Sequence, residues 1–169
     1  MGKAEDQLMA WLQDAHATEE QAEAMLKATV SRIGNYPALK ARTEQHLEET
    51  RRHAALIRGC IERRGGTTSA LKDAGARMAG LGQALSGLFV GDEVMKASIA
   101  SYAFEAMEIA SYRVLISTAR EVGDQETARV CAQILKEEEA MADWLEENMP
   151  VLTRNFLNGE RAPDAALRT

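Results

Sequence analysis

Residues 94–119 of this chain read VMKASIASYAFEAMEIASYRVLISTA. These 26 residues contain only four charged side chains, which are Lys96, Glu105, Glu108 and Arg113. A helix that is apolar nearly all the way round is usually buried on all sides, so this segment predicts a central helix of an all-α core. Glu105 and Glu108 lie one helical turn apart in its middle, and we therefore expect both carboxylates to be buried as well.

Three further segments repeat apolar residues at steps of three and four, which is the spacing of an amphipathic helix. The expected helices are Glu5–Ile33, Pro37–Arg64, Asp92–Glu121 and 124–149. Asp92 is expected to cap the third helix, and Pro37 suits the first turn of the second. Pro150 is expected to end or kink the fourth helix, after which Val151–Leu157 would form a short fifth helix.

The connections between these segments indicate how the helices are joined. Those near residues 33–37 and 121–125 are short, whereas residues 65–92 are rich in Gly, Ala and Ser and carry only a weak helical pattern. We interpret residues 65–92 as a long crossover that contains a short helix. This connectivity is typical of a four-helix bundle with one crossover, the ferritin-like arrangement. We expect one ferritin-like domain over residues 1–158 and a flexible tail over 159–169.

The composition favours helix and limits the classes of partner. Only 5% of the residues are aromatic, and the net charge is −6 with no basic stripe, which argues against a nucleic-acid partner. No apolar run is long enough to cross a membrane and no signal-peptide pattern is present, so we expect a cytoplasmic protein. Cys60 and Cys131 fall on apolar helix faces and are expected to be buried free thiols.

Each long segment also places a glutamate on its apolar stripe. Glu19 and Glu138 interrupt the stripes of the first and fourth segments, and His46, Glu49 and His53 share one face of the second at steps of three and four. The carboxylates expected to meet at one level of the bundle are Glu19, Glu49, Glu105 and Glu138. The same inward position on four helices is the observation on which the functional interpretation depends.

A buried carboxylate without a partner is strongly destabilising, so a group of them needs compensation. Shared protons, a buried basic partner and divalent metal would each provide it, and Arg113 is the basic candidate on the third helix. Two divalent ions would balance four carboxylates and suit oxygen and imidazole ligands. For His46 we favour a half-buried surface histidine slightly over a metal ligand, whereas His53 fits a ligand and a core histidine equally well. For Glu108, a role as a metal ligand and a role as a residue that contacts the ligands both stay open.

Four stretches of the chain resemble the YciE/YciF family of ferritin-like bacterial stress proteins. They are LQDAHATEEQ at residues 12–21, HLEET at 46–50, FEAMEIASY at 104–112 and LKEEEAMADWL at 135–145. The resemblance implies a helical bundle, often dimeric, with a dinuclear metal site like that of rubrerythrins. By position it assigns the site to Glu19, Glu49, Glu105, Glu108 and Glu138.

The chain departs from the Glu-x-x-His pattern of the broader ferritin-like superfamily. Glu49 and His53 are four residues apart, Met141 follows Glu138 by three, and Ala106 stands where relatives often have a histidine. The expected site is therefore rich in carboxylates and poor in histidines.

We accordingly expect a metal-binding protein with a carboxylate-bridged dinuclear site for iron or manganese, acting in bacterial stress response as a homodimer. The expected ligands are Glu19, Glu49, His53, Glu105, Glu108 and Glu138. Tyr102 or Tyr112 is expected to hydrogen-bond a ligand carboxylate. An oxidase-type or peroxidase-type activity stays open. The alternative is a dimeric, non-catalytic stress or interaction protein whose buried carboxylates are protonated or ion-paired, and an iron-storage shell subunit is a third interpretation.

Overall fold

The computed structural model describes residues 2–67 and 93–159, and this part of the chain folds into helices without a strand. The helices are α1 (Lys3–Val30), α2 (Pro37–Arg63), α4 (Glu93–Glu121) and α5 (Gln125–Leu157). The predicted all-α class and the four long helices are confirmed, with helix bounds that differ by at most three residues from the expected ones except at the C-terminal end of α5. The expected crossover helix, the Asp92 cap and the tail beyond residue 159 lie outside the described residues.

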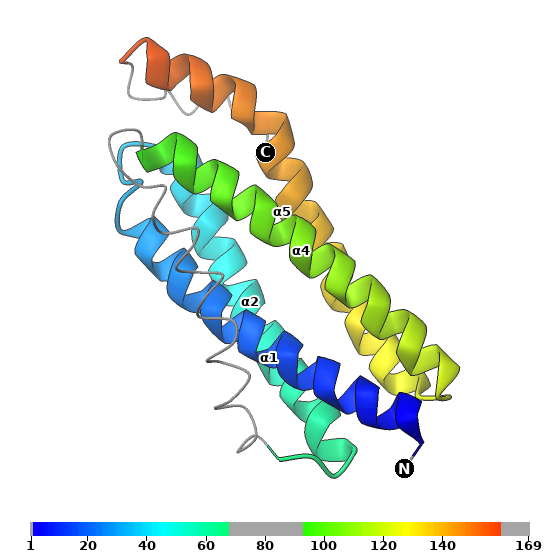
Figure 1. The fold of residues 1–169 in the computed structure, drawn as a ribbon. Coiled ribbons are helices and arrows are strands. Elements are labelled where there is room, and N and C mark those ends of the chain that lie inside the picture. Colours follow the sequence, from blue (N-terminus) through cyan, green and yellow to red (C-terminus); the bar gives the residue numbers. More distant parts are fainter. Residues whose placement is uncertain (1, 68–92, 160–169) are drawn as a thin grey trace.

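The four helices form a bundle in which α1 and α2 run antiparallel, as do α4 and α5 (Figure 1). Short turns join the members of each pair, and α1 also packs on α4 while α2 packs on α5. Helices α2 and α4 run in the same direction (Figure 1). The end of α2 and the start of α4 therefore lie at opposite ends of the bundle, as expected where a long crossover joins the second and third helices.

The turns that end the helices follow from local chemistry. Pro37 occupies the first turn of α2, where its missing N–H leaves no carbonyl unpaired. Gly65 and Gly123 adopt a φ of 77°, a left-handed conformation that glycine adopts without steric cost after a helix. Asp124 caps α5 by accepting a hydrogen bond from the Thr127 N–H at 3.0 Å.

Helix α5 continues through Pro150, so the predicted short fifth helix is wrong. The chain is helical from Gln125 to Leu157 and bends in its C-terminal part (Figure 1). Proline removes one backbone donor and crowds the preceding turn, which kinks a helix without having to end it. The residues beyond the bend stay in the helix because Leu152 and Phe156 pack against an apolar cluster at this end of the bundle.

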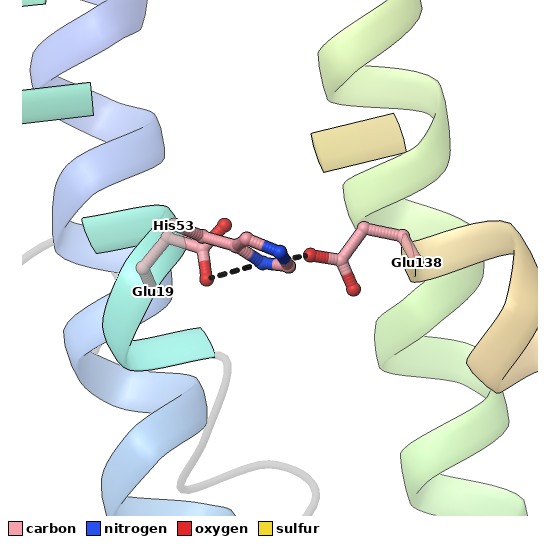
Figure 2. Close-up of side chains that lie close together, drawn as sticks. All are labelled: Glu19, His53 and Glu138. Carbon is pink, nitrogen blue, oxygen red and sulfur yellow. Dashed lines mark ion pairs between the residues drawn. The ribbon is translucent and has the colours of Figure 1, made fainter. Parts of the chain in front are cut away.

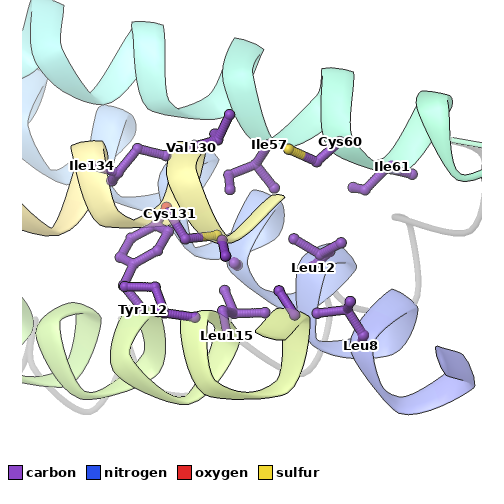
Figure 3. Packing of buried hydrophobic residues seen from close by; sticks show 14 residues of the cluster. Leu8, Leu12, Ile57, Cys60, Ile61, Tyr112, Leu115, Val130, Cys131 and Ile134 are labelled. Carbon is purple, nitrogen blue, oxygen red and sulfur yellow. The ribbon is translucent and has the colours of Figure 1, made fainter. Parts of the chain in front are cut away.

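Two apolar clusters form the core, one toward each end of the bundle. The first is built from all four helices and includes Leu12, Ile57, Leu115 and Ile134 (Figure 3). The second contains Ile33, Leu39, Val94, Met141, Leu145 and Leu152. Along every helix, the stretch between the two clusters carries the inward glutamates. The fold thus encloses a polar layer between two apolar ones.

Both cysteines lie in the first cluster, where Figure 3 shows them among aliphatic side chains. Cys60 and Cys131 are buried and free, which confirms the predicted buried thiols. None of the described helices combines the length and the apolar character needed to cross a membrane.

His16 is a buried polar residue of α1, one turn before Glu19. It is 0% exposed, and neither ring nitrogen has a hydrogen-bond partner within the described residues. Its Nδ1 atom lies 3.8 Å from an oxygen of Glu20, whose side chain is exposed. Burial lowers the pKa of His16, Arg58 lowers it further, and Glu20 only partly opposes them. Folding therefore shifts the protonation equilibrium of His16 toward the neutral imidazole.

Truncation of a core residue should cost far more stability than the same truncation at the surface. Ile134 is 0% exposed in the first cluster, whereas Ile99 on α4 is 53% exposed. We expect Ile134→Ala to lower the free energy of unfolding by about 2–5 kcal/mol and Ile99→Ala by roughly 0.5 kcal/mol or less. Urea unfolding of both variants checks this, and equal losses would contradict the assignment of the core.

His16 should make the folded protein sensitive to acid. Below about pH 6.5 the unfolded chain binds a proton at this imidazole that the folded chain does not bind, so stability falls as the pH decreases. We expect His16→Leu to flatten the loss of unfolding free energy between about pH 7.5 and 5.5 in metal-free protein. Urea unfolding across this range measures the two slopes. Parallel slopes for variant and parent would show that His16 does not titrate differently on folding.

Candidate metal centre

Six ionisable residues from all four helices fill the polar layer. None of them exposes more than 2% of its surface. They are Glu19 on α1, His46 and His53 on α2, Glu105 and Glu108 on α4, and Glu138 on α5. The sequence predicted that Glu19, Glu105, Glu108 and Glu138 point inward, and their burial confirms this prediction.

The first group of converging side chains consists of Glu19, His53 and Glu138. Figure 2 shows the imidazole of His53 between the two carboxylates, which reach it from α1 and α5. The His53 Nδ1 atom lies 2.8 Å from Glu138 Oε1 and 3.7 Å from Glu19 Oε2. One nitrogen or oxygen atom from each residue lies within 4.8 Å of the others, which is close enough to share one cation.

The second group consists of His46, Glu105 and Glu138. The His46 Nε2 atom lies 3.3 Å from Glu105 Oε2 and 3.3 Å from Glu138 Oε2. These ligand atoms also lie within 4.8 Å of one another. Glu138 belongs to both groups, with Oε1 toward His53 and Oε2 toward His46, so its carboxylate can bridge two neighbouring cation positions.

The outward nitrogen of His46 is held by a carboxylate. His46 Nδ1 lies 2.9 Å from Glu49 Oε2, and Glu49 in turn accepts hydrogen bonds from Arg42 at 3.2 Å and Gln45 at 2.8 Å. A donor bond from this nitrogen leaves Nε2 with its lone pair toward the cluster. Such an outer carboxylate is the common support of a metal-binding histidine.

The outward nitrogen of His53 is held in the same way. Its Nε2 atom lies 2.7 Å from Glu137 Oε2, and Glu137 also accepts a hydrogen bond from Arg52 at 3.0 Å. The inward nitrogen Nδ1 is thereby left facing Glu19 and Glu138. Each imidazole thus offers one nitrogen to the cluster and is oriented through the other.

This geometry corrects the expectation for His46 and changes the position expected for Glu49. His46 is 1% exposed and is therefore no half-buried surface histidine. It lies seven residues before His53, so both rings share one face of α2, with centroids 6.4 Å apart. Glu49 lies against His46 and belongs to neither three-residue group.

Of the three side chains predicted to contact the buried glutamates, one does so and two do not. The Tyr112 hydroxyl donates a hydrogen bond to Glu19 Oε1, whereas the Tyr102 hydroxyl is turned away and donates to Glu146 at 3.2 Å. Arg113 is the basic partner expected for the buried glutamates, but it is 64% exposed and pairs with Glu139. Within the described residues, the basic side chains that pair with Glu19, Glu105 and Glu138 are the two histidines.

Sequence reasoning missed Glu137 as the partner of His53. It lies next to Glu138, and a residue beside an inward one is expected to point to solvent. Its side chain is 30% exposed and so lies at the edge of the buried face. Glu137 and Glu139 flank Glu138 in a run of three glutamates. Nothing in the local pattern indicated that Glu137 would contact His53 whereas Glu139 would pair with Arg113.

The electrostatics of the layer are those of buried carboxylates facing imidazoles. Burial disfavours protonation of both rings, but the surrounding glutamates outweigh it and raise the pKa of His46 to about 12 and that of His53 to about 10. Burial raises the pKa of Glu105 to about 7 and holds that of Glu108 well above its usual range. In the case of Glu138, the two histidines overcome burial and lower the pKa to about 2. In the absence of a metal ion, these pKa shifts favour protonated imidazoles and a protonated Glu108 in the layer.

Several buried ligand atoms nevertheless have no hydrogen-bond partner within the described residues. They are Glu19 Oε2, His53 Nδ1, Glu105 Oε2, Glu108 Oε1 and both oxygens of Glu138. Although His53 Nδ1 and Glu138 Oε1 are close, their directions do not make a hydrogen bond. Orphaned buried oxygens are rare in folded proteins and call for an explanation. Carboxylate oxygen and imidazole nitrogen are donors that suit iron and manganese, so the residues present fit a metal centre.

Comparison with known proteins agrees with this architecture. Residues 3–158 match the family described as "Domain of unknown function (DUF892)". The crystal structure of a protein from Xanthomonas campestris pv. campestris is 40% identical, with a TM-score of 0.79 over 95% of this chain and 100% of the other. The Escherichia coli stress protein YciF is 23% identical, with a TM-score of 0.72 over the same shares of the two chains.

A more distant likeness concerns the fold alone. Symerythrin from Cyanophora paradoxa, in a structure reduced with dithionite, is 16% identical, with a TM-score of 0.52 over 89% of this chain and 83% of the other. YciF and symerythrin are ferritin-like helical bundles, and the fold predicted for this chain is confirmed. The chain belongs to the DUF892 family, and the predicted relation to the YciE/YciF-type proteins is confirmed.

Proposed function

We propose that this protein is a ferritin-like metal-binding protein whose bundle holds a carboxylate-bridged dinuclear centre of iron or manganese. The observation that carries the proposal is the pair of buried three-residue groups that share Glu138. Each group offers one imidazole nitrogen and two carboxylates, a donor set that suits these divalent ions. Because the two groups use different oxygens of Glu138, a single carboxylate can connect both positions.

The charges of the layer support two cations rather than one. The four carboxylates of Glu19, Glu105, Glu108 and Glu138 are buried together, and two divalent ions would neutralise them with both histidines uncharged. Within the described residues, no hydrogen bond or ion pair joins Glu108 to either histidine, and its Oε1 atom has no hydrogen-bond partner. We assign it as an additional ligand that either position can use. Tyr112 fixes the orientation of Glu19 through its hydroxyl.

Iron or manganese would supply the redox chemistry in such a centre. The chain would supply the ligands, the outer supports of the two imidazoles, and the two apolar clusters that flank the layer. A role in bacterial stress response is proposed from the likeness to the stress protein YciF. We further propose a cytoplasmic homodimer, as the family resemblance implies.

A metal-free bundle is the second candidate, and one observation favours it. The two histidines lie close enough to the buried carboxylates to neutralise part of their charge as imidazolium ions, with Nδ1 of His53 2.8 Å from Glu138. In that case the layer would be a structural ion-pair network in a dimeric interaction protein. The two candidates differ in whether the purified protein retains an ion.

Substitution of the shared carboxylate should remove metal from both positions. We expect protein expressed without a His-tag, with iron and manganese supplied, to hold one to two ions per chain, and Glu138→Gln to lose most of them. Glutamine keeps the shape of the side chain but removes the charge and one ligand oxygen. Elemental mass spectrometry of the purified proteins measures the metal content.

The neighbouring residue provides a matched control for this experiment. Glu139→Gln removes the same charge one position along α5, where the carboxylate pairs with Arg113 at the surface. It should keep the metal content of the parent protein. Absence of metal from the parent would favour the ion-paired bundle, and equal metal content in the two variants would remove Glu138 from the site.

Glu49 should act on metal affinity through His46 rather than as a ligand. Since its carboxylate is bonded to the outward nitrogen of His46, Glu49→Gln should keep the ion count at saturating metal but weaken affinity by about 10–100-fold. Competition with a chelator of known affinity measures the change. Loss of a whole ion at saturation would instead show that Glu49 is itself a ligand, as the family resemblance implies.

A further inference from the structure

A hollow between α1 and α4 leads from the surface toward the polar layer. It encloses about 190 Å³, and its lining includes Asp14, Thr18, Met107, Glu108, Ser111 and Tyr112. The first two residues belong to α1 and the other four to α4. The hollow therefore opens along the seam where these two helices pack against each other.

The inner end of the hollow is formed by residues of the polar layer. Glu108 is 2% exposed, and its Oε1 atom has no hydrogen-bond partner within the described residues. Tyr112 lies beside it and donates its hydroxyl hydrogen to Glu19, a member of the first three-residue group. A solute in the hollow thus meets Glu108, itself a candidate ligand, and is separated from Glu19 by the side chain of Tyr112.

The outer end of the hollow carries negative charge. Asp14 is partly exposed there, and Ser111 is exposed on the facing helix. Thr18 donates its hydroxyl hydrogen to the backbone carbonyl of Asp14 at 2.9 Å. This hydroxyl therefore does not bond to the Asp14 carboxylate. No Lys, Arg or His belongs to the described lining, so a cation meets a carboxylate at each end and no repelling charge between them.

A second hollow, between α4 and α5, encloses about 650 Å³. Its lining includes Arg113, Arg120 and Lys136 together with Glu121 and Glu139, so its basic side chains outnumber its acidic ones. Its described lining contains none of the six buried residues of the polar layer. Size alone therefore does not select a path for a divalent cation, whereas charge and contact with the layer both favour the smaller hollow.

We propose that the hollow between α1 and α4 is the route by which a divalent cation reaches the polar layer. Asp14 attracts the cation at the surface, and the unpaired oxygen of Glu108 receives it at the inner end. This inference rests on the proposed function, because a route for cations matters only if the polar layer binds metal. It also gives Glu108 a separate role, as the acceptor nearest to the surface.

The rate of metal uptake tests the route. Metal-stripped full-length protein is mixed with cobalt(II) alone at low ionic strength, and the visible absorption of the bound ion is followed by stopped flow. Asp14→Asn should slow uptake by about threefold or more, because one attracting charge is removed from the mouth. Ser111→Trp should slow it through steric blockage. Final occupancy should stay unchanged in both variants, since neither residue belongs to the two ligand groups.

Asp6→Asn is the matched control, because it removes the same charge from an exposed position of α1 remote from the hollow. The inference stands if both hollow variants take up cobalt more slowly than this control. It is overturned if either variant binds at the rate of the control. Should circular dichroism show that Ser111→Trp is misfolded, Ser111→Leu replaces it. A parent protein that binds no cobalt would refute the proposed function itself, an outcome distinct from unchanged uptake rates.

Discussion

The burial of like charges is the constraint on which the rest of this structure depends. Four glutamates meet between two apolar clusters, at a depth where ionised carboxylates without compensation would prevent folding. The clusters fix the helices in register, and this register brings the glutamates to one level. The stability of the bundle and the chemistry of its centre are therefore linked, because whatever neutralises the layer also stabilises the fold.

Helix α2 supplies the basic groups that face the buried carboxylates within the described part of the chain. Its two histidines are seven residues apart, which is two helical turns, and both rings enter the layer. Each ring is supported from outside, His46 by Glu49 and His53 by Glu137. These supports orient the inward nitrogens before any cation binds. A site of this kind loses little conformational freedom on binding, which favours affinity.

Helix α4 links the centre to the surface. It packs against α1 and α5 and carries Glu105 and Glu108 inward, whereas small residues and Ser111 lie on its outer side. The same helix therefore closes the polar layer and leaves the hollow beside Glu108. The Xanthomonas protein and YciF share the fold over 95% of this chain, but YciF is only 23% identical.

The sequence by itself determined the four helices and the inward positions of Glu19, Glu105, Glu108 and Glu138, because helical periodicity is a local property that residue spacing reveals. Only the tertiary structure decided the burial of His46, the pairing of Glu137 with His53, the outward direction of Arg113 and the passage of α5 through Pro150. Adjacent residues on a helix differ by about 100° in direction, so those at the edge of an apolar face can turn either way. Which way they turn depends on the rotation of each helix against its neighbours, and only packing fixes that rotation.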